Sequence, residues 1–450
     1  MASEAKKKSP LQLLVDVKAS EVAPMVVSAL WIFLAITAYY IIKPIRGETL
    51  QKLILVDNKP KALVLTTIFI GFFAYFYGKV VSRIERKRLI VTTYLIFIGC
   101  IGAFAGVMPH ANWVTGYIFF VWVSTFSVMV VSQFWALQAD VWTKEEGTRL
   151  FGFIGLGTVS GGIAGTFVTA MAKGVATWKL LLASAGILVV CLGLSLYILA
   201  FATKKPHDPP KPDLPPSDGE PKDVKPPDGS SGVAKPPDTP KASNAIAMVL
   251  SSPYLRLIAA MTLILNLVNS NNEWILDKLF SKMGDGDART FYADFYLWQN
   301  IFAAAIQFLL TGPIQRHFGA RVALLFLPLV GMLGGSAFLL IPTLAVIRLQ
   351  KIAENATDYS IQSNTREFLY LPTSKIEKYA AKNVNDTFVV RTGDLLAAGS
   401  IEIAKLLLAS VGDNGLRILV GANLVLGAAW IVIVLRIGVL NKRMMSAHHG

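Results

Sequence analysis

Charged and amide side chains recur at helical spacing inside three long hydrophobic stretches of this sequence. In residues 253–275, Asn266, Asn269 and Glu273 are three or four positions apart, and Asp277 continues the series. The other two stretches carry Arg348, Lys351, Glu354, Asn355, Asp358 and Gln362 in one case, and Arg391, Asp394, Glu402 and Lys405 in the other. Residues at this spacing share one face of a helix. Ionisable groups inside a membrane helix are costly, so such faces usually line a cavity or pair with one another.

Several of these groups are cations, which indicates binding of an anion. Lys43 and Arg46 follow the first hydrophobic stretch and add two positive charges. Arginine can give a phosphate two parallel hydrogen bonds, and lysine offers it a point charge. Structural salt bridges are the alternative, above all for residues 348–358, which can pair along their own helix. Arg46 and Glu273 have no obvious partner of opposite charge on their own helix, so we favour a functional role for both.

The sequence contains no candidates for other chemistries. The two cysteines lie in apolar runs, and the five histidines are scattered without the spacing of metal ligands. No Ser/His/Asp or Cys/His arrangement is present, so we expect neither an enzyme nor a bound cofactor. The glycines of residues 152–165 lack the preceding strand and the Gly-Lys-Ser/Thr of a nucleotide-binding loop. Gly157, Gly161 and Gly165 are four apart, which instead predicts close helix packing in lipid.

The composition indicates a protein embedded in a membrane. Of 450 residues, 54% are hydrophobic and 16% are charged, against roughly 25% charged in soluble domains. Mean hydropathy is +0.52, yet the net charge is +14. The hydrophobic content excludes a disordered basic tail. The long apolar runs exclude a DNA-binding globule, so we expect no nucleic-acid partner.

Windows of about 20 apolar residues, the length that crosses a bilayer, predict an all-α polytopic protein with twelve transmembrane helices. They lie near residues 24–42, 62–81, 89–108, 115–139, 151–172, 179–202, 253–275, 291–311, 322–340, 341–363, 387–410 and 415–437. The tenth and eleventh carry charges and have the weakest hydrophobic signal. Two six-helix halves joined by a linker are typical of transporters that rock about a central site.

A proline-rich segment divides the two halves. Residues 203–243 hold 12 of the 22 prolines, a density that blocks helix and strand and predicts an extended cytoplasmic linker. The expected organisation is an N-terminal segment, a six-helix bundle, this linker, a second bundle and a tail, at residues 1–23, 24–202, 203–243, 244–440 and 441–450. Most of the 43 basic residues then fall on one side, which predicts cytoplasmic termini.

Two basic loops at equivalent places in the halves are similar to each other. They are Gly78-Lys-Val-Val-Ser-Arg83-Ile-Glu-Arg-Lys-Arg88 and Gly312-Pro-Ile-Gln-Arg316-His-Phe-Gly-Ala-Arg321. Both resemble the short basic loop of the major facilitator superfamily. The first has Ser82 near the place where that loop carries an acidic residue.

A longer stretch resembles the ATP/ADP translocase family of intracellular bacteria and plastids. It includes Tyr359, Ser360, Thr365, Glu367, Tyr370, Pro372, Lys375, Lys378, Lys382, Asp386, Arg391 and Gly393. Further similar segments are Phe134-Trp135 with Arg149-Leu-Phe151, and Asn266-Leu-Val with Glu273-Trp274. The resemblance implies a major-facilitator-like antiporter that exchanges ATP and ADP by alternating access, a monomer in a bacterial inner membrane rather than a plastid envelope. It also implies that Arg46, Asp140, Glu273 and Lys382 matter for exchange.

The expected substrate-binding set combines the polar faces with this resemblance. It comprises Lys43, Arg46, Asp140, Asn269, Glu273, Lys378, Lys382 and Arg391. We expect the phosphates to bind among Arg46, Lys378, Lys382 and Arg391. We expect Asp140 and Glu273 either to hold these cations in the empty site or to position a base or ribose.

Two other functions remain open. Proton-coupled transport of another organic anion would require that Asp140 or Glu273 titrates. A membrane receptor or assembly protein that no longer transports would instead act through the linker.

Overall fold

The computed structural model describes residues 17–81, 83–204, 242–284 and 286–449. The expected linker, apart from its ends, and most of the expected N-terminal segment lie outside these residues. The described part of the chain is helical and contains no strand. The expected all-α fold is therefore confirmed.

The first group of helices surrounds α2, which is buried along most of its length. Its members are α2 (Ala19–Thr49), α3 (Lys59–Val81), α4 (Arg86–Val107), α5 (Trp113–Val141), α6 (Lys144–Met171) and α7 (Thr177–Lys204), with short turns at Leu50–Ile54, Val56–Asn58 and Met108–His110. The expected first span is too short, because α2 and its final turn continue to Ile54.

The second group has six long helical segments and two short helices. The long segments are α9 (Pro253–Ser281), α10 (Ala288–Ile306) with a turn at Gln307–Thr311, α11 (Gly312–Leu340), α12 (Leu344–Thr357) continued by Asp358–Gln362 and α13 (Ser363–Phe368), α15 (Val390–Val411) preceded by Asn385–Val389, and α16 (Asn414–His449). The short helices are α8 (Ala242–Ser251) and α14 (Lys375–Val384). Gly319, with φ of 72°, breaks α11. The chain therefore turns at this residue, whereas the sequence predicted a loop over all of residues 312–321.

Nine stretches of the described residues are long and apolar enough to cross a membrane. One of them, Ala288–Leu340, has 53 residues and contains both α10 and α11, so it supplies two crossings. The helical segments α12–α13 and α15 are not among the nine, and they carry the charged faces noted in the sequence. All these helices follow the order of the twelve expected spans.

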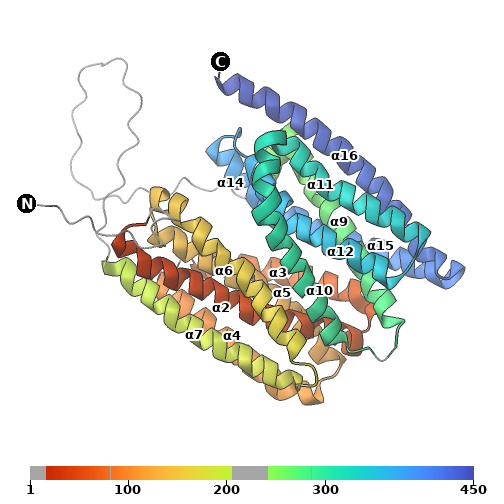
Figure 1. Ribbon diagram of the computed structural model, residues 1–450, viewed down its shortest axis with the longest axis horizontal. Helices are drawn as coiled ribbons and strands as arrows, with labels where there is room; N and C mark the ends of the chain where they lie inside the picture. The colour runs from red at the N-terminus through yellow and green to blue at the C-terminus, as the bar shows by residue number, and fades with distance from the viewer. Residues whose placement is uncertain (1–16, 82, 205–241, 285, 450) are drawn as a thin grey trace, which may run out of the picture.

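The two groups lie side by side as two bundles (Figure 1). α2 to α7 occupy the lower left of the view and α9 to α16 the upper right, with α10 packed against α2 and α6. α15 packs against α3 across the same interface. We call the end of the molecule where α2 and α9 end the closed end. The end where α7 ends and α8 begins is the linker end.

The glycines of α6 allow it to pack directly on the backbone of α2. A Cβ atom at Gly157, Gly161 or Gly165 would lie 2.4–2.5 Å from a carbonyl oxygen of α2. The close helix packing predicted from the four-residue spacing is confirmed.

Gly161→Ala should therefore destabilise the protein. The new methyl group would meet the carbonyl oxygen of Phe33 at 2.4 Å, and overpacking of this kind costs about 1–3 kcal/mol. Gly155→Ala is the matched control in the same helix, because a Cβ there contacts nothing within 4 Å. Melting temperatures in one detergent compare the two variants, and equal values would contradict the packing argument.

Candidate functional site

A polar cavity of about 170 Å³ lies between the two bundles near the middle of the molecule. Its walls come from α2, α9, α10, α12 and the turn that follows α12, and they are formed by Tyr39, Lys43, Arg46, Asn269, Glu273, Leu276, Tyr292, Phe295, Tyr296, Asn355 and Tyr359. We call it the central cavity. The structure thus brings together four of the eight expected binding residues, from both halves of the chain.

Lys43 is held by aromatic rings rather than by an acid. Its ammonium lies 4.0 Å from the ring centroid of Tyr296 and 5.0 Å from that of Tyr40, with Tyr39 and Tyr359 at 5.9 and 6.0 Å. Lys43 is 8% exposed, and no carboxylate of the described residues forms an ion pair with it. Cation–π contacts stabilise the charge by roughly 0.5–2 kcal/mol each without neutralising it. Lys43 is therefore a buried amino group without an acidic partner, and a bound anion would stabilise its charged form.

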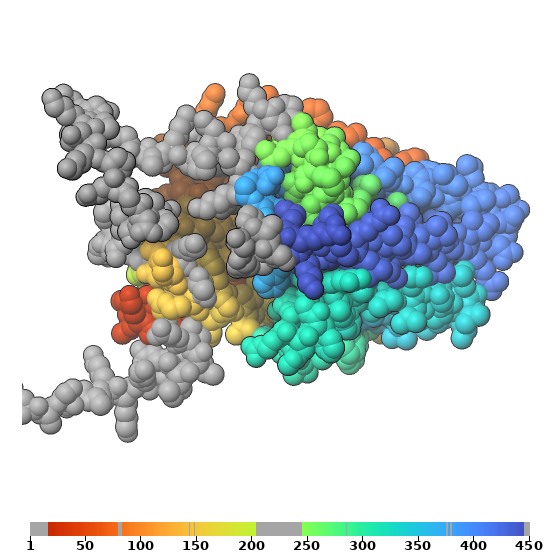
Figure 2. Space-filling model, turned by 90° about the horizontal axis from the view of Figure 1, so that it is seen from above, coloured from red at the N-terminus to blue at the C-terminus, as the bar shows by residue number. Residues whose placement is uncertain are grey.

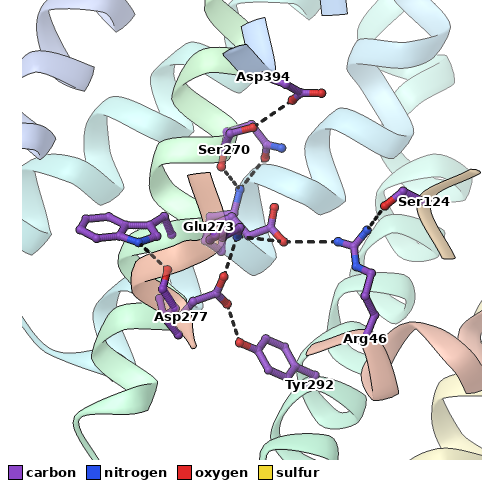
Figure 3. A network of polar contacts seen from close by, with 12 residues as sticks. Arg46, Ser124, Ser270, Glu273, Asp277, Tyr292 and Asp394 are labelled. Atoms are coloured by element: carbon purple, nitrogen blue, oxygen red, sulfur yellow. Dashed lines mark hydrogen bonds and ion pairs between the residues drawn. The ribbon is translucent and has the colours of Figure 1, made fainter. Parts of the chain in front are cut away.

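Arg46 lies one helical turn beyond Lys43 and bridges the halves. Its guanidinium donates to Ser124 Oγ at 3.0 Å and lies 3.9 Å from Glu273 Oε1 (Figure 3). The guanidinium also stacks over the ring of Phe120, with 4.6 Å between Cζ and the ring centroid. Because the contact with Glu273 is long, Arg46 retains donors that a second anion can use.

Glu273 also takes part in the contacts that close the molecule. Lys59 Nζ lies 3.6 Å from Glu273 Oε1 and 2.6 Å from Asp277 Oδ2. Tyr292 donates its hydroxyl to the other oxygen of Asp277 at 2.5 Å (Figure 3). Gln51 donates to Tyr292 Oη at 2.9 Å and to the carbonyl oxygen of Asp277 at 3.1 Å. This largely buried network joins α2, the turn after it and α3 to α9 and α10, and it holds the two halves together at the closed end.

A second pair across the closed end lies nearer the surface. Lys278 of α9 contacts Asp57 at 2.6 Å, with half of the Asp57 side chain exposed. The indole of Trp274 donates to the carbonyl oxygen of Val56 at 3.3 Å beside it.

The charges of α12 are mostly neutralised. Lys351 Nζ contacts Asn269 Oδ1 at 2.5 Å, Asn355 Oδ1 at 3.2 Å and Glu354 Oε2 at 3.3 Å. The alternative of structural salt bridges within residues 348–358 therefore fits Lys351 and Glu354, which pair along their own helix. Arg348 pairs with Asp294 of α10 instead.

The other four expected binding residues do not line the central cavity. Asp140 pairs with Arg86 at 2.6 Å, and Lys382 pairs with Glu367 at 2.7 Å, in both cases at exposed positions. Arg391 pairs with Asp394 at 2.9 Å on its own helix. Lys378 lies on α14, which packs against α8 at the linker end. Of the cations expected around one phosphate, only Arg46 lies at this cavity. The chain turns after α13 and carries α14, with Lys378 and Lys382, away from it, whereas Arg391 lies on α15 and pairs with Asp394.

A wider cavity of about 720 Å³ extends from the middle of the molecule toward the linker end. Tyr39 and Tyr359 line both cavities. The wide cavity adds the aromatic rings of Trp135 and Phe151 and the amides of Asn300, Gln307 and Asn364. The buried Nδ2 of Asn300 has no hydrogen-bond partner among the described residues. These walls offer flat apolar surfaces together with an unused donor.

The sequence interpretation missed several residues of these sites. Lys59, Gln51, Tyr292, Tyr296 and Tyr359 were not identified as binding or closing residues. The repeat Phe291-Tyr292 and Phe295-Tyr296 at four-residue spacing in α10 is a signal that could have indicated an aromatic wall.

Comparison with known proteins supports this architecture. Residues 23–350 match the family model described as Major Facilitator Superfamily. The chain belongs to the major facilitator superfamily. It is a polytopic membrane protein of the transporter type found in that superfamily. A search of curated proteins found no match.

Solved structures of several transporters have a similar fold. The nucleoside transporter NupG is 12% identical, with 92% of this chain and 99% of that chain covered and a TM-score of 0.60. A bacterial homologue of the iron transporter ferroportin, in an inward-facing state, is 11% identical, with coverages of 94% and 99% and a TM-score of 0.62. A bacterial homologue of the human lysosomal transporter Spinster is 13% identical, with coverages of 95% and 98% and a TM-score of 0.55. At these identities the similarity concerns the fold alone.

Proposed function

We propose that this transporter is an antiporter that exchanges nucleotides, with ATP and ADP as the favoured pair. The observation that carries the proposal is Lys43, a buried ammonium that has aromatic neighbours and no carboxylate partner. A buried charge without a counterion is costly, so the site favours a ligand that brings negative charge. The similarity of residues 356–394 to the ATP/ADP translocases suggests that this ligand is a nucleotide.

The two cavities suit the two parts of a nucleotide. In our proposal the phosphates bind to Lys43 and Arg46 in the central cavity, where charge-assisted hydrogen bonds are strongest. The base extends into the wide cavity and stacks on rings such as Tyr359 or Trp135. Asn300, whose Nδ2 has no hydrogen-bond partner among the described residues, lies in the wall of the wide cavity and could donate to a base edge. The volume of about 720 Å³ falls in the range of pockets for small ligands.

Exchange rather than one-way transport follows from the same charges. Alternating access requires the halves to close around the cavity at the linker end. Without an anion, this movement would bury Lys43 and Arg46 more deeply with only Glu273 nearby. The binding site of the proposed antiporter therefore reorients from one side of the membrane to the other only when a nucleotide is bound. The wide cavity extends toward the linker end, which we propose is the cytoplasmic side, in the inner membrane of a bacterium.

Ligand-dependent melting of the purified protein tests the binding step. ATP and ADP should raise the melting temperature, because a ligand that binds only the folded state stabilises it by about 2.7 kcal/mol at 100 times its Kd. Orthophosphate should have a much smaller effect, because it makes no contact in the wide cavity. No shift with any nucleotide for a folded protein would contradict the proposal.

A second candidate function is proton-coupled transport of another organic anion. Asp358 favours it, because this carboxyl group lines an inner cavity between α9, α11, α12 and α16, where its buried Oδ1 has no hydrogen-bond partner among the described residues. Asp140 pairs with Arg86, and Glu273 contacts both Arg46 and Lys59, so in this candidate function Asp358 takes the role of proton carrier that the sequence suggested for those two residues. Vesicles without internal substrate are given a pH gradient, and uptake is followed. Uptake that the gradient drives, and that Asp358→Asn loses, would favour this candidate over exchange.

A further inference from the structure

A basic groove of about 610 Å³ lies between the end of α16 and the part of α11 that follows Gly319. α16 and α11 lie along one another on this face (Figure 2). Arg321, Lys442 and Arg443 line the groove and are exposed, whereas Leu324, Ile437 and Val439 give it apolar walls. No acidic residue is among the described residues that line it.

Two of the three basic residues of this groove have no acidic partner among the described residues. Neither Arg321 nor Arg443 forms an ion pair with any described residue. In the first half of the chain, Arg86 at the start of α4 is paired with Asp140 at 2.6 Å. The aliphatic part of Arg321 packs on Gly438, where a Cβ would lie 2.6 Å from the arginine Cδ. This contact keeps the guanidinium of Arg321 beside the groove.

Exposed apolar side chains continue from the groove along both helices. On α11 they are Val322, Phe326, Leu329 and Leu333, and on α16 they are Val439, Val432, Val425 and Ile418. Their spacing of three, four or seven positions places each series on one helical face. These faces are apolar enough to contact lipid tails, and the groove lies where they reach one end of the membrane-crossing helices.

We propose that this groove binds the headgroup of an anionic phospholipid, with the acyl chains along the exposed faces of α11 and α16. Guanidinium groups bind phosphate through paired hydrogen bonds, and basic pockets between transmembrane helices are suited to acidic headgroups. The apolar faces favour a lipid over a free phosphate, which could use only the charged rim. This site is separate from the central cavity and does not depend on which substrate is transported.

Lipid-dependent melting of the full-length protein tests the proposal. Delipidated protein is titrated with phosphatidylglycerol and, separately, with phosphatidylcholine. Phosphatidylglycerol should raise the melting temperature at concentrations at which phosphatidylcholine has no effect. The double variant Arg321→Gln/Arg443→Gln should bind phosphatidylglycerol at least tenfold more weakly, because each basic residue contributes an appreciable attraction to acidic lipid. Arg316→Gln is the matched control, since Arg316 is exposed near the same turn but does not line the groove.

A single variant and a competition experiment test the lipid site further. The single variant Arg443→Gln changes an exposed residue, so it should fold normally and still bind phosphatidylglycerol several-fold more weakly. Inorganic phosphate at millimolar concentration should not compete with the lipid. The proposal would be overturned by any of three results: equal effects of both lipids, unchanged lipid affinity in Arg443→Gln and the double variant, or displacement of the lipid by inorganic phosphate.

Discussion

Lys43→Gln should reduce uptake of labelled ATP by about 10- to 100-fold. Glutamine is polar and one atom shorter than lysine, and it lacks the charge that the four tyrosines surround. A hydrogen bond to a charged group contributes roughly 1.5–3 kcal/mol, and each 1.4 kcal/mol corresponds to a tenfold change in affinity. The variant should fold, because removing an uncompensated buried charge does not leave an opposite charge unpaired. Initial uptake rates in proteoliposomes measure the effect.

Lys52→Gln is the control for Lys43→Gln. Lys52 is an exposed lysine near the closed end that pairs with Glu48 at 2.7 Å, and exposed pairs of this kind contribute little to stability. Its loss should leave uptake nearly unchanged. If Lys43→Gln transported ATP at the rate of the unmodified protein, an anion site at the central cavity would be refuted.

Lys59→Gln should strongly destabilise the closed end. Lys59 is 1% exposed and contacts two carboxylates, Asp277 and Glu273. Removing one partner of a buried ion pair typically costs about 3–5 kcal/mol, because the remaining charge is left without compensation. We therefore expect a large fall in melting temperature. The double variant Lys59→Gln/Asp277→Asn should recover much of the loss, because one unpaired carboxylate is then neutral.

The pair of Lys278 and Asp57 provides the comparison across the same interface. It is partly exposed, so Lys278→Gln should change stability by no more than about 1 kcal/mol. Equal effects of Lys59→Gln and Lys278→Gln would show that the buried network does not hold this end closed. A double variant no more stable than Lys59→Gln would contradict the pairing with Asp277.

Local sequence patterns predicted the helices and part of their packing. The twelve hydrophobic stretches correspond in order to the helical segments, because their length and composition are set by the bilayer. The glycines of α6 predicted a close contact, since small residues four apart lie on one face. Their partner, α2, could not be identified from the pattern, because any helix with a smooth face would fit against it.

The candidate site was predictable only where one helix supplies its residues. Lys43 and Arg46 on α2, and Asn269 and Glu273 on α9, follow from polar positions inside hydrophobic stretches. Lys59 begins α3, where a lysine is usually a solvated residue at a helix end, and its burial against Asp277 depends on the approach of the two halves.

The resemblance placed Lys382 in the substrate site together with Arg46. Sequence similarity carries no information on the direction in which a helix leaves a turn. α14 leads away from the central cavity, so Lys382 pairs with Glu367 instead.

Exchange in proteoliposomes is the most direct test of the proposed function. Vesicles containing the purified protein are loaded with ADP or with buffer alone, and uptake of labelled external ATP is followed without an imposed pH gradient. We predict that internal ADP stimulates uptake at least tenfold and that Lys43→Gln abolishes the stimulation. Equal ATP uptake into ADP-loaded and empty vesicles, by protein shown to be folded, would contradict nucleotide exchange.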